Sequence, residues 1–394
     1  MTEPVDAPKR RRPLLRRFTP VVHRLDHAIA RLSARRDVLV ELRTPVYHAV
    51  LGPIAEALAA EPDVHVWFTS EQPDRVRGLV PEGRFLTHAA AEWRRFDLYV
   101  NGDPWAAVRL RRCAHRVNFF HGVAGKYDLD NPAGLPLGFE DYDYVGFINR
   151  DRLSRYIDAG IVHPARAVLV GYPKLDRLAS GGYEPSATRR AIGVSSDRPV
   201  ALYAPTYSES SSLHLAGEAI VRALAAAGFA VLVKLHDRSL DHDSRYHGGV
   251  DWRARFAALT RDLGDERLRF LDVADACPLL AAADVMVTDH SSIGFEYLVL
   301  DRPLVVFEAP GLAQAARINP EKIALLQSAA ALARTPDEAA RAAAHDLAHR
   351  ADRSAARRRV AQAMFHDPGR ATARAARLLM RLLRPASEAV VLES

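Results

Sequence analysis

Residues 285–293 read VMVTDHSSI, and this stretch decides the fold. Three apolar residues lead to a threonine, two serines follow, and Ile293 opens a run with helical spacing. This pattern is typical of a buried strand that turns directly into a helix. A helix that begins at the carboxyl end of a parallel strand directs free backbone N–H groups at the edge where open α/β sheets bind ligands. The stretch therefore predicts an α/β protein with a site at this edge.

Short apolar strands alternate with helical patterns on both sides of this stretch. The chain has 394 residues, enough for two domains. Apolar strands separated by helices predict parallel sheets that helices cover on both faces, and a Gly-, Ser- and Pro-rich joint lies at 177–199. We predict two doubly wound, Rossmann-like α/β domains that face a cleft, with a basic N-terminal helix and a helical C-terminal tail. The predicted boundaries are 1–36 for the leader, 37–180 and 199–366 for the two domains, and 367–394 for the tail.

Composition and charge exclude several classes of protein. Residues 1–36 hold ten Lys and Arg against three acids, whereas the rest of the chain holds 44 bases and 45 acids. A nucleic-acid enzyme carries its positive charge on the body, so we expect no nucleic-acid partner. Two cysteines make neither a disulfide framework nor a thiolate zinc site. Because the sequence has neither a membrane-spanning apolar run nor a signal-peptide pattern, we expect a cytoplasmic protein.

The leader, residues 1–36, combines its arginines with an apolar stripe at helical spacing. The pattern fits a basic amphipathic helix on an anionic membrane surface, which predicts a peripheral protein on the inner face of the cell membrane. It also fits a helix packed on the body, and on charge alone a nucleic-acid tail. These alternatives stay open. The stripe consists of Phe18, Val21, Val22, Leu25, Ile29 and Leu32.

Three polar motifs follow predicted strands and come from both halves of the chain: His121-Gly122, His236, and the 288–292 block. A histidine at a strand end accepts a proton from a hydroxyl near neutral pH, or it is a structural residue that hydrogen-bonds locally. Ser291 or Ser292 can cap the following helix, and the same helix start can bind a phosphate. The two roles are compatible, and together the motifs indicate one shared cleft.

The sequence lacks the motifs of a standard zinc site, an ATP-binding glycine loop and a serine hydrolase. The acidic and histidine side chains of 236–247 match no standard zinc spacing, so we expect a solvated loop and no metal site there. A Gly-rich loop that ends in Gly-Lys-Ser/Thr is absent, as is a Gly-x-Ser-x-Gly elbow. An ATP kinase and an α/β-hydrolase are therefore disfavoured.

In this order and spacing, the motifs resemble the CDP-glycerol glycerophosphotransferase family of teichoic acid and capsule polymer synthesis. The resemblance covers about residues 115–380, while 37–115 match only the general GT-B type of first domain. Two departures, Asp237 in place of a proline and His290 in place of a tyrosine, bear on which alcohol the donor carries. The matching stretches are His121–Lys126, Gly171–Asp176, Tyr203–Tyr207, Lys234–His236, Ala283–Tyr297, Asp301–Phe307 and Asp367–Ala371.

The resemblance implies a GT-B enzyme whose first domain faces the acceptor and whose second domain holds the donor nucleotide. It implies transfer of glycerol phosphate, or a similar alcohol phosphate, from a CDP-activated donor to a hydroxyl of a membrane-linked glycan, with release of CMP. His121 is then the general base, and His236 stabilises the transferred phosphoryl group. The expected donor-binding residues are Thr288, Ser291, Ser292, Glu296, Thr206, Arg238 and Lys174, with Gly122, Lys126 and Asp289 as further site residues.

Positioning and electrostatics carry most of the catalysis in phosphoryl transfer. We therefore expect no cofactor besides the CDP-alcohol donor, and no obligatory divalent metal ion. Two alternatives remain: a GT-B glycosyltransferase or nucleotide-sugar epimerase that uses a UDP-sugar, and a non-catalytic scaffold that binds polymer or membrane. Release of CMP or of UDP from a panel of donors discriminates between them.

Overall fold

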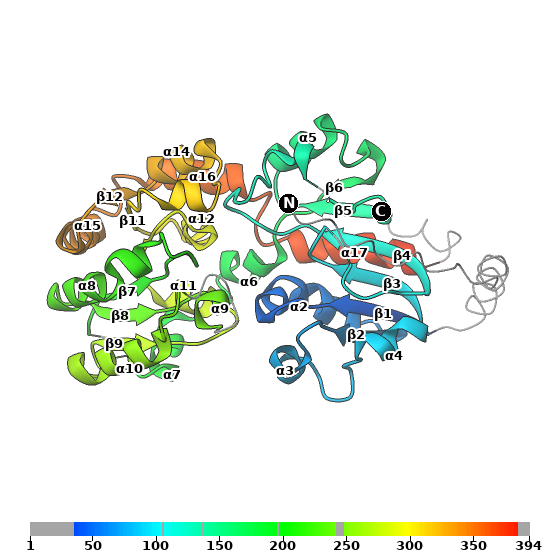
Figure 1. The fold of residues 1–394 in the computed structure, drawn as a ribbon, viewed down its shortest axis with the longest axis horizontal. Helices are drawn as coiled ribbons and strands as arrows, with labels where there is room; N and C mark the ends of the chain where they lie inside the picture. The colour runs from blue at the N-terminus through cyan, green and yellow to red at the C-terminus, as the bar shows by residue number, and fades with distance from the viewer. Residues whose placement is uncertain (1–34, 105, 136, 195–196, 242–247, 385–394) are drawn as a thin grey trace, which may run out of the picture.

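The structure, a computed structural model, describes residues 35–384 except 105, 136, 195–196 and 242–247. Two six-stranded parallel sheets form the centres of two domains that lie side by side (Figure 1). The expected fold class, α/β with two doubly wound domains, is confirmed. The predicted leader helix lies outside the described residues.

The first sheet has the strand order β2-β1-β3-β4-β5-β6. Because successive side chains of a strand point to opposite faces, one face packs on α2 and α17 and the other on α4 and α5. The strands are β1 (Arg36–Glu41), β2 (Val64–Thr69), β3 (Arg95–Asn101), β4 (Arg112–Phe119), β5 (Tyr144–Phe147) and β6 (Ala167–Leu169). The helices are α2 (Pro45–Ala59), α3 (Pro73–Val76), α4 (His88–Trp93) and α5 (Arg150–Asp158). Two short helices follow β6: α6 (Asp176–Ala179) lies between the domains, and α7 (Pro185–Ala191) packs on α11 of the second domain (Figure 1).

The second sheet has the order β12-β11-β10-β7-β8-β9, with α11, α12 and α16 on one face and α8, α10 and α15 on the other. Its strands are β7 (Val200–Tyr203), β8 (Ala230–Val233), β9 (Leu268–Phe270), β10 (Val285–Thr288), β11 (Leu304–Phe307) and β12 (Ala331–Ala333). The helices are α8 (Ser212–Ala226), α9 (Asp237–Leu240), α10 (Trp252–Leu263), α11 (Cys277–Ala282), α12 (Ser292–Tyr297), α13 (Leu312–Ala315), α14 (Pro320–Ser328), α15 (Pro336–Ala348), α16 (Ser354–Met364) and α17 (Ala371–Leu383).

The last helix returns to the first domain, where α17 packs on α2 (Figure 1). Small and apolar residues at four-residue intervals, from Ala371 to Leu383, bury one face of α17. The Asp176 carboxylate accepts hydrogen bonds from the N–H groups of Gly369, Ala371 and Thr372 at 2.9, 3.1 and 2.5 Å. A carboxylate at this position caps the helix and interacts favourably with its dipole. The stretch 171–176 therefore fixes where the C-terminal helix docks.

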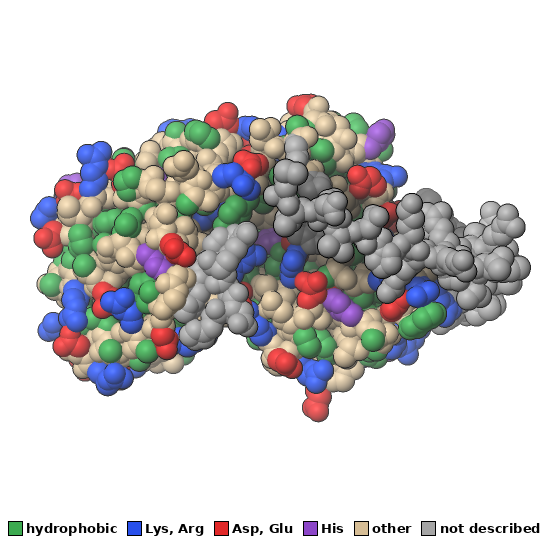
Figure 2. All heavy atoms as spheres, in the orientation of Figure 1, with side chains coloured by type: hydrophobic (Ala, Val, Ile, Leu, Met, Phe, Trp, Pro, Cys, Tyr) green, Lys and Arg blue, Asp and Glu red, His purple; other side chains and the backbone are tan. Residues whose placement is uncertain are grey.

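The surface of the molecule is mixed in charge and indented between the domains. Figure 2 shows basic and acidic side chains interspersed over this face of both domains, which agrees with the neutral balance of the body. Within the described part of the chain, every helix is too short or too polar to cross a bilayer.

Replacing Gly171 with alanine tests the docking of α17. Gly171 has φ +94°, and an added Cβ would lie 2.5 Å from the His366 carbonyl oxygen. Gly228 has the same φ, but nothing lies within 4 Å of its added Cβ. Strain at positive φ costs about 1–2 kcal/mol and overpacking about 1–3 kcal/mol more.

We therefore expect Gly171→Ala to lower the free energy of unfolding by about 2–5 kcal/mol, and Gly228→Ala by about 1–2 kcal/mol. Urea unfolding of both variants measures the difference. Equal losses would contradict the close approach of Gly171 to residue 366.

Candidate functional site

A first-domain loop that follows β4 carries His121 and Lys126 to the domain boundary. Gly125 has φ +61°, and a Cβ there would overlap the Asp130 carboxylate. Its carbonyl accepts a hydrogen bond from the backbone N–H of Asn319, in the second domain, at 3.1 Å. Glycine is therefore required at this point, because the chain turns tightly over a buried side chain while it contacts the other domain.

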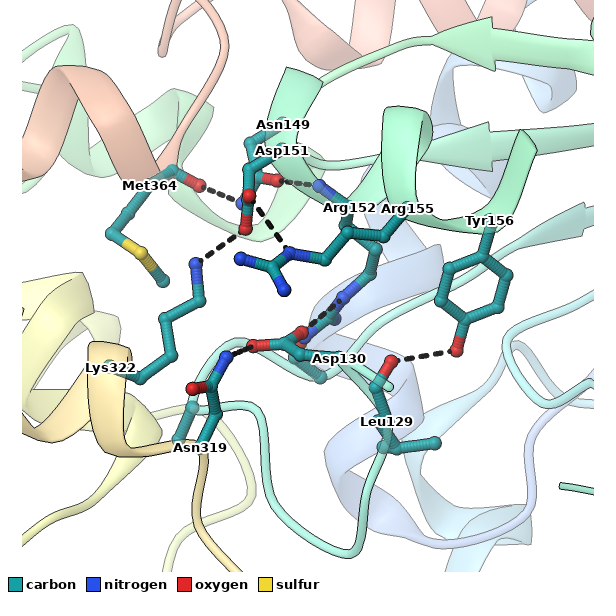
Figure 3. Close-up of polar contacts among 12 residues, drawn as sticks. Leu129, Asp130, Asn149, Asp151, Arg152, Arg155, Tyr156, Asn319, Lys322 and Met364 are labelled. Carbon is teal, nitrogen blue, oxygen red and sulfur yellow. Dashed lines mark hydrogen bonds and ion pairs between the residues drawn. The ribbon is translucent and has the colours of Figure 1, made fainter. Parts of the chain in front are cut away.

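A buried ion pair between Arg152 and Asp130 holds the same loop in place (Figure 3). Arg152 and Asp130 are 1% and 3% exposed, and the guanidinium donates to Asp130 Oδ1 through Nε at 3.0 Å and Nη2 at 2.5 Å. Nη1 of Arg152 donates to the Gly122 carbonyl, and Asn319 Nδ2 donates to Asp130 Oδ2 at 3.4 Å. The backbone directly after His121 is thus fixed by side chains from both domains.

His121 is held as a neutral imidazole with one nitrogen available. Its Nδ1 lies 2.8 Å from the Gly102 carbonyl oxygen, so Nδ1 carries the proton and Nε2 keeps the lone pair. The Tyr47 ring packs edge-on at 4.4 Å, and Tyr47 donates to Asp103 at 2.6 Å. Burial lowers the pKa of His121, and the positive charge of Arg152 lowers it further, while Asp103 acts to raise it. A neutral imidazole with a free lone pair is a proton acceptor.

The second domain supplies a loop after β7 that Asp289 organises. The Asp289 carboxylate accepts from the backbone N–H groups of Thr206 and Ser212 at 2.9 and 3.0 Å, and from Ser212 Oγ at 2.9 Å. Thr288 Oγ1 donates to the Ala204 carbonyl at 2.6 Å. Both Thr288 and Asp289 are 0% exposed. Their side chains hold the loop in place, and their hydrogen-bonding groups are occupied by the protein itself.

The two loops meet through residues that the sequence motifs contain. Lys126 Nζ donates to Thr206 Oγ1, and Ala124 N–H donates to Ser292 Oγ at 3.2 Å. Ser291 stands at the N-cap position of α12, yet its side chain makes no capping hydrogen bond. Burial lowers the pKa of Lys126 to about 8. The junction of the domains therefore combines a lysine with two serines at a helix start.

His236 follows β8, at the N-cap position of α9, and lies beside a carboxylate. Its Nδ1 lies 2.5 Å from Asp237 Oδ1, and Nδ1 donates a hydrogen bond to this carboxylate. The Arg238 N–H, 3.2 Å from Nδ1 and 2.9 Å from the same Asp237 oxygen, then donates to the carboxylate. Burial lowers the pKa of His236, and Asp237 acts to raise it. The exposed Arg238 guanidinium lies 5.1 Å from the Tyr207 ring centre.

Lys174 and Glu296, both predicted to bind the donor, pair with each other across the domains. Lys174 Nζ lies 2.6 Å from Glu296 Oε2, and the two side chains are 8% and 4% exposed. Burial opposes the charge on the lysine, but the Glu296 carboxylate raises the pKa of Lys174 well above its ordinary value. This pair is a charged contact between the first and second domains.

Several residues at the junction escaped the sequence analysis. Tyr127 and Tyr207 stack at 6.5 Å, and the Tyr207 ring lies 4.2 Å from that of His236. Arg75 of α3 reaches Asp237 at 3.7 Å. Tyr207 is the last residue of the 203–207 motif, and Tyr127 directly follows the 121–126 motif. Their positions after predicted strands could therefore have indicated that they lie at the site. Arg75 lies outside every motif, and only the tertiary structure reveals it.

His290, one of the two departures from the family pattern, is an unsatisfied buried side chain. It is 7% exposed, and neither ring nitrogen has a hydrogen-bond partner among the described residues. Burial lowers the pKa of His290, and nearby Lys126 lowers it further. The first domain offers a neutral proton acceptor, His121, and cationic and hydroxyl groups from both domains gather where the domains meet. A reaction between a hydroxyl and an anionic substrate requires such an arrangement.

Comparisons with known proteins agree with this arrangement. The family model described as CDP-glycerol:poly(glycerophosphate) glycerophosphotransferase matches residues 138–380, more than half of the chain. A solved structure of a histidine-to-asparagine variant of the wall teichoic acid polymerase TagF is 16% identical, with a TM-score of 0.69 over 94% of this chain and 98% of that one. A structure of this variant soaked with CDPG is 14% identical, with a TM-score of 0.65 over 93% of this chain and 98% of that one.

A more distant fold likeness extends to sugar-nucleotide epimerases. The UDP-GlcNAc 2-epimerase from Neisseria meningitidis, bound to UDP-GlcNAc, is 11% identical, with a TM-score of 0.54 over 88% of this chain and 99% of that one. No curated protein sequence matches this chain. At these identities the structural neighbours show the fold alone.

The lowered pKa of His121 predicts a loss of stability in acid. The unfolded chain binds a proton on this imidazole at a higher pH than the folded chain does, so the free energy of unfolding falls as the pH drops below about 6.5. His236 and His290 act in the same direction. We expect His121→Gln to make this fall shallower, measured by urea unfolding from pH 7.5 to 5.0. An unchanged slope would contradict a buried neutral His121.

Proposed function

This chain belongs to the CDP-glycerol:poly(glycerophosphate) glycerophosphotransferase family, as its motifs indicated, and we propose that it transfers an alcohol phosphate from a CDP-activated donor to a hydroxyl of a membrane-linked polymer, with release of CMP. The observation that carries the proposal is that the loop of neutral His121 meets the second domain, through Lys126 at Thr206 and through the Ala124 N–H at Ser292. A polymer acceptor is supported by the family's description, which names poly(glycerophosphate).

In the proposed reaction His121 acts as the general base. Its Nε2 takes the proton from the acceptor hydroxyl, whose oxygen forms a bond to the phosphorus that carries the alcohol. The bond from this phosphorus to the bridging oxygen breaks, and CMP leaves with the electron pair. Because the Gly102 carbonyl fixes the proton on Nδ1, the imidazole presents the correct nitrogen without reorganisation.

The second domain stabilises the negative charge that develops on the donor. We propose that His236, Arg238 and the α12 start at Ser291 and Ser292 contact the donor phosphates, because these groups lie after β8 and β10 at the domain boundary. Lys126 is the first domain's contribution to the same charge. Thr288 and Asp289 contribute indirectly, since they hold the loop that presents Thr206.

We further propose that the reaction needs no cofactor besides the donor. Cationic side chains and backbone N–H groups stabilise a transferred phosphoryl group as positioned electrostatic partners. The test is a donor panel of CDP-glycerol, CDP-ribitol and UDP-GlcNAc with a lipid-linked acceptor, assayed with and without EDTA. CMP release from a CDP-alcohol that persists in EDTA supports the proposal. UDP release without CMP would replace it with a sugar-nucleotide enzyme.

Substituting the two histidines tests their roles. We expect His121→Ala and His236→Ala each to lower turnover by about 10²–10⁴-fold, the range for a positioned acid–base or charge-stabilising group. His115→Ala is the control, because His115 lies in β4, the strand that leads to His121, with its side chain 38% exposed. Turnover with the best donor of the panel is the measurement. Wild-type turnover in either site variant would make that histidine structural.

We also propose that the basic leader holds the enzyme on the inner face of the membrane that anchors its acceptor. Residues 1–36 carry an excess of seven positive charges over a neutral body, and residues 1–34 lie outside the described part of the chain. Each Lys or Arg near an anionic surface contributes about 1 kcal/mol to binding. A tether to this surface raises the effective concentration of a lipid-linked acceptor.

Deletion of residues 1–34 should therefore release the protein from anionic vesicles at low salt, because the body has no net attraction for them. Turnover on a soluble acceptor analogue should persist, while turnover on a lipid-linked acceptor should fall. Vesicle co-sedimentation of the full-length and shortened proteins measures the effect. Equal co-sedimentation would rule out the tether.

A further inference from the structure

Two lysines of the second domain are buried to the same degree but differ in their partners. Lys322 is 6% exposed, and its ammonium donates to Asp151 at 2.9 Å across the domain boundary (Figure 3). Lys234 is 8% exposed, and its ammonium makes no hydrogen bond or ion pair with any residue that the structure describes. A buried charge without a partner is costly to a protein. Lys234 therefore needs an explanation that Lys322 does not.

The carboxylates around Lys234 are already engaged. The acidic groups that act on its charge are Asp237, Glu296 and Asp272. Asp237 pairs with His236 at 2.5 Å, Glu296 with Lys174 at 2.6 Å, and Asp272 with Arg253 at 2.7 Å. Each carboxylate thus has another partner closer than Lys234. Lys174 adds a second positive charge near this ammonium.

The position of Lys234 directs it toward the domain boundary. Side chains of β8 alternate between the two faces of the sheet, and Leu232 belongs to the core that the first domain shares, whereas Val233 belongs to the opposite one. Lys234 continues the ladder through its N–H bond to the Tyr203 carbonyl, so it shares the face of Leu232. Glu296 of α12 and Lys174 of the first domain, whose charges act on Lys234, lie on the same side.

We propose that Lys234 is an anion-binding residue of the donor site and that its ligand is the diphosphate bridge of the nucleotide donor. A diphosphate oxygen would accept a charge-assisted hydrogen bond from the Lys234 ammonium, which has no acceptor among the described residues. This bond would compensate the buried charge. During transfer the same ammonium faces the oxygen of the departing CMP. The inference deepens the proposed function and rests on it for the identity of the ligand.

The experiment compares Lys234→Met with Lys322→Met, which removes the paired lysine as a matched control. The probes are inorganic pyrophosphate and CDP, titrated by calorimetry into the full-length protein, together with Tm of the ligand-free variants. We expect Lys234→Met to weaken both affinities by about 10- to 100-fold, the range for a lost hydrogen bond to a charged group. Lys234→Arg should retain most of the affinity.

The Tm of the ligand-free proteins should rank the two methionine variants in the opposite order to their ligand affinity. Lys234→Met should keep or raise Tm, because it removes an unpaired buried charge, while Lys322→Met should lower Tm and keep the affinity for pyrophosphate. Wild-type affinity in Lys234→Met, a loss of Tm equal to that of Lys322→Met, or no binding of either probe to the wild-type protein would each overturn the inference.

The outcome is separable from the proposed function, because pyrophosphate carries neither cytidine nor an alcohol. Lys234-dependent binding of pyrophosphate without CMP release from any CDP-alcohol would keep the inference and overturn the proposed transfer. CMP release from a CDP-alcohol, with unchanged affinities in Lys234→Met, would support the proposed transfer and overturn the role of Lys234.

Discussion

The buried pair of Arg152 and Asp130 fixes the loop on which the site depends. Desolvating two charges is expensive, and the cost is recovered only where geometry and further hydrogen bonds are good. Here the guanidinium also donates to the Gly122 carbonyl and the carboxylate also accepts from Asn319. The pair therefore does more than hold one domain together. It links the residue after His121 to the second domain, so the orientation of the domains and the position of the proton acceptor are set by the same contacts.

The motifs that led to the family divide into two physical kinds. Asp176 and Gly171 belong to one of the matching motifs, yet their role is structural. Asp176 caps α17, and Gly171 allows the close approach of residue 366 just before that helix. Thr288 and Asp289 likewise hold a loop. In contrast, Lys126 and Ser292 join the two domains at the predicted site. A motif's presence identifies the family, but only the contacts separate the residues that build the cleft from those that line it.

The sequence predicted the alternation of strands and helices because apolar strands and strand-end motifs are local features. It also predicted that His121, His236 and the 288–292 block come from strand ends. It did not predict that Lys174 and Glu296 pair, or that Arg75 reaches Asp237, because these contacts join residues far apart in the chain. The missing partner of Lys234 is a property of its whole surroundings, and no pattern of neighbouring residues indicates it.

The central claim is that one site, built by both domains, holds the donor between the loop after β4 and the loops after β7, β8 and β10. The most direct measurement is a crystal structure of the His121→Ala variant with CDP-glycerol, in which the donor stays intact. The account predicts the diphosphate beside Lys234 and the start of α12, with the glycerol phosphate facing residue 121. A donor bound away from this junction, or held by the first domain alone, would contradict it.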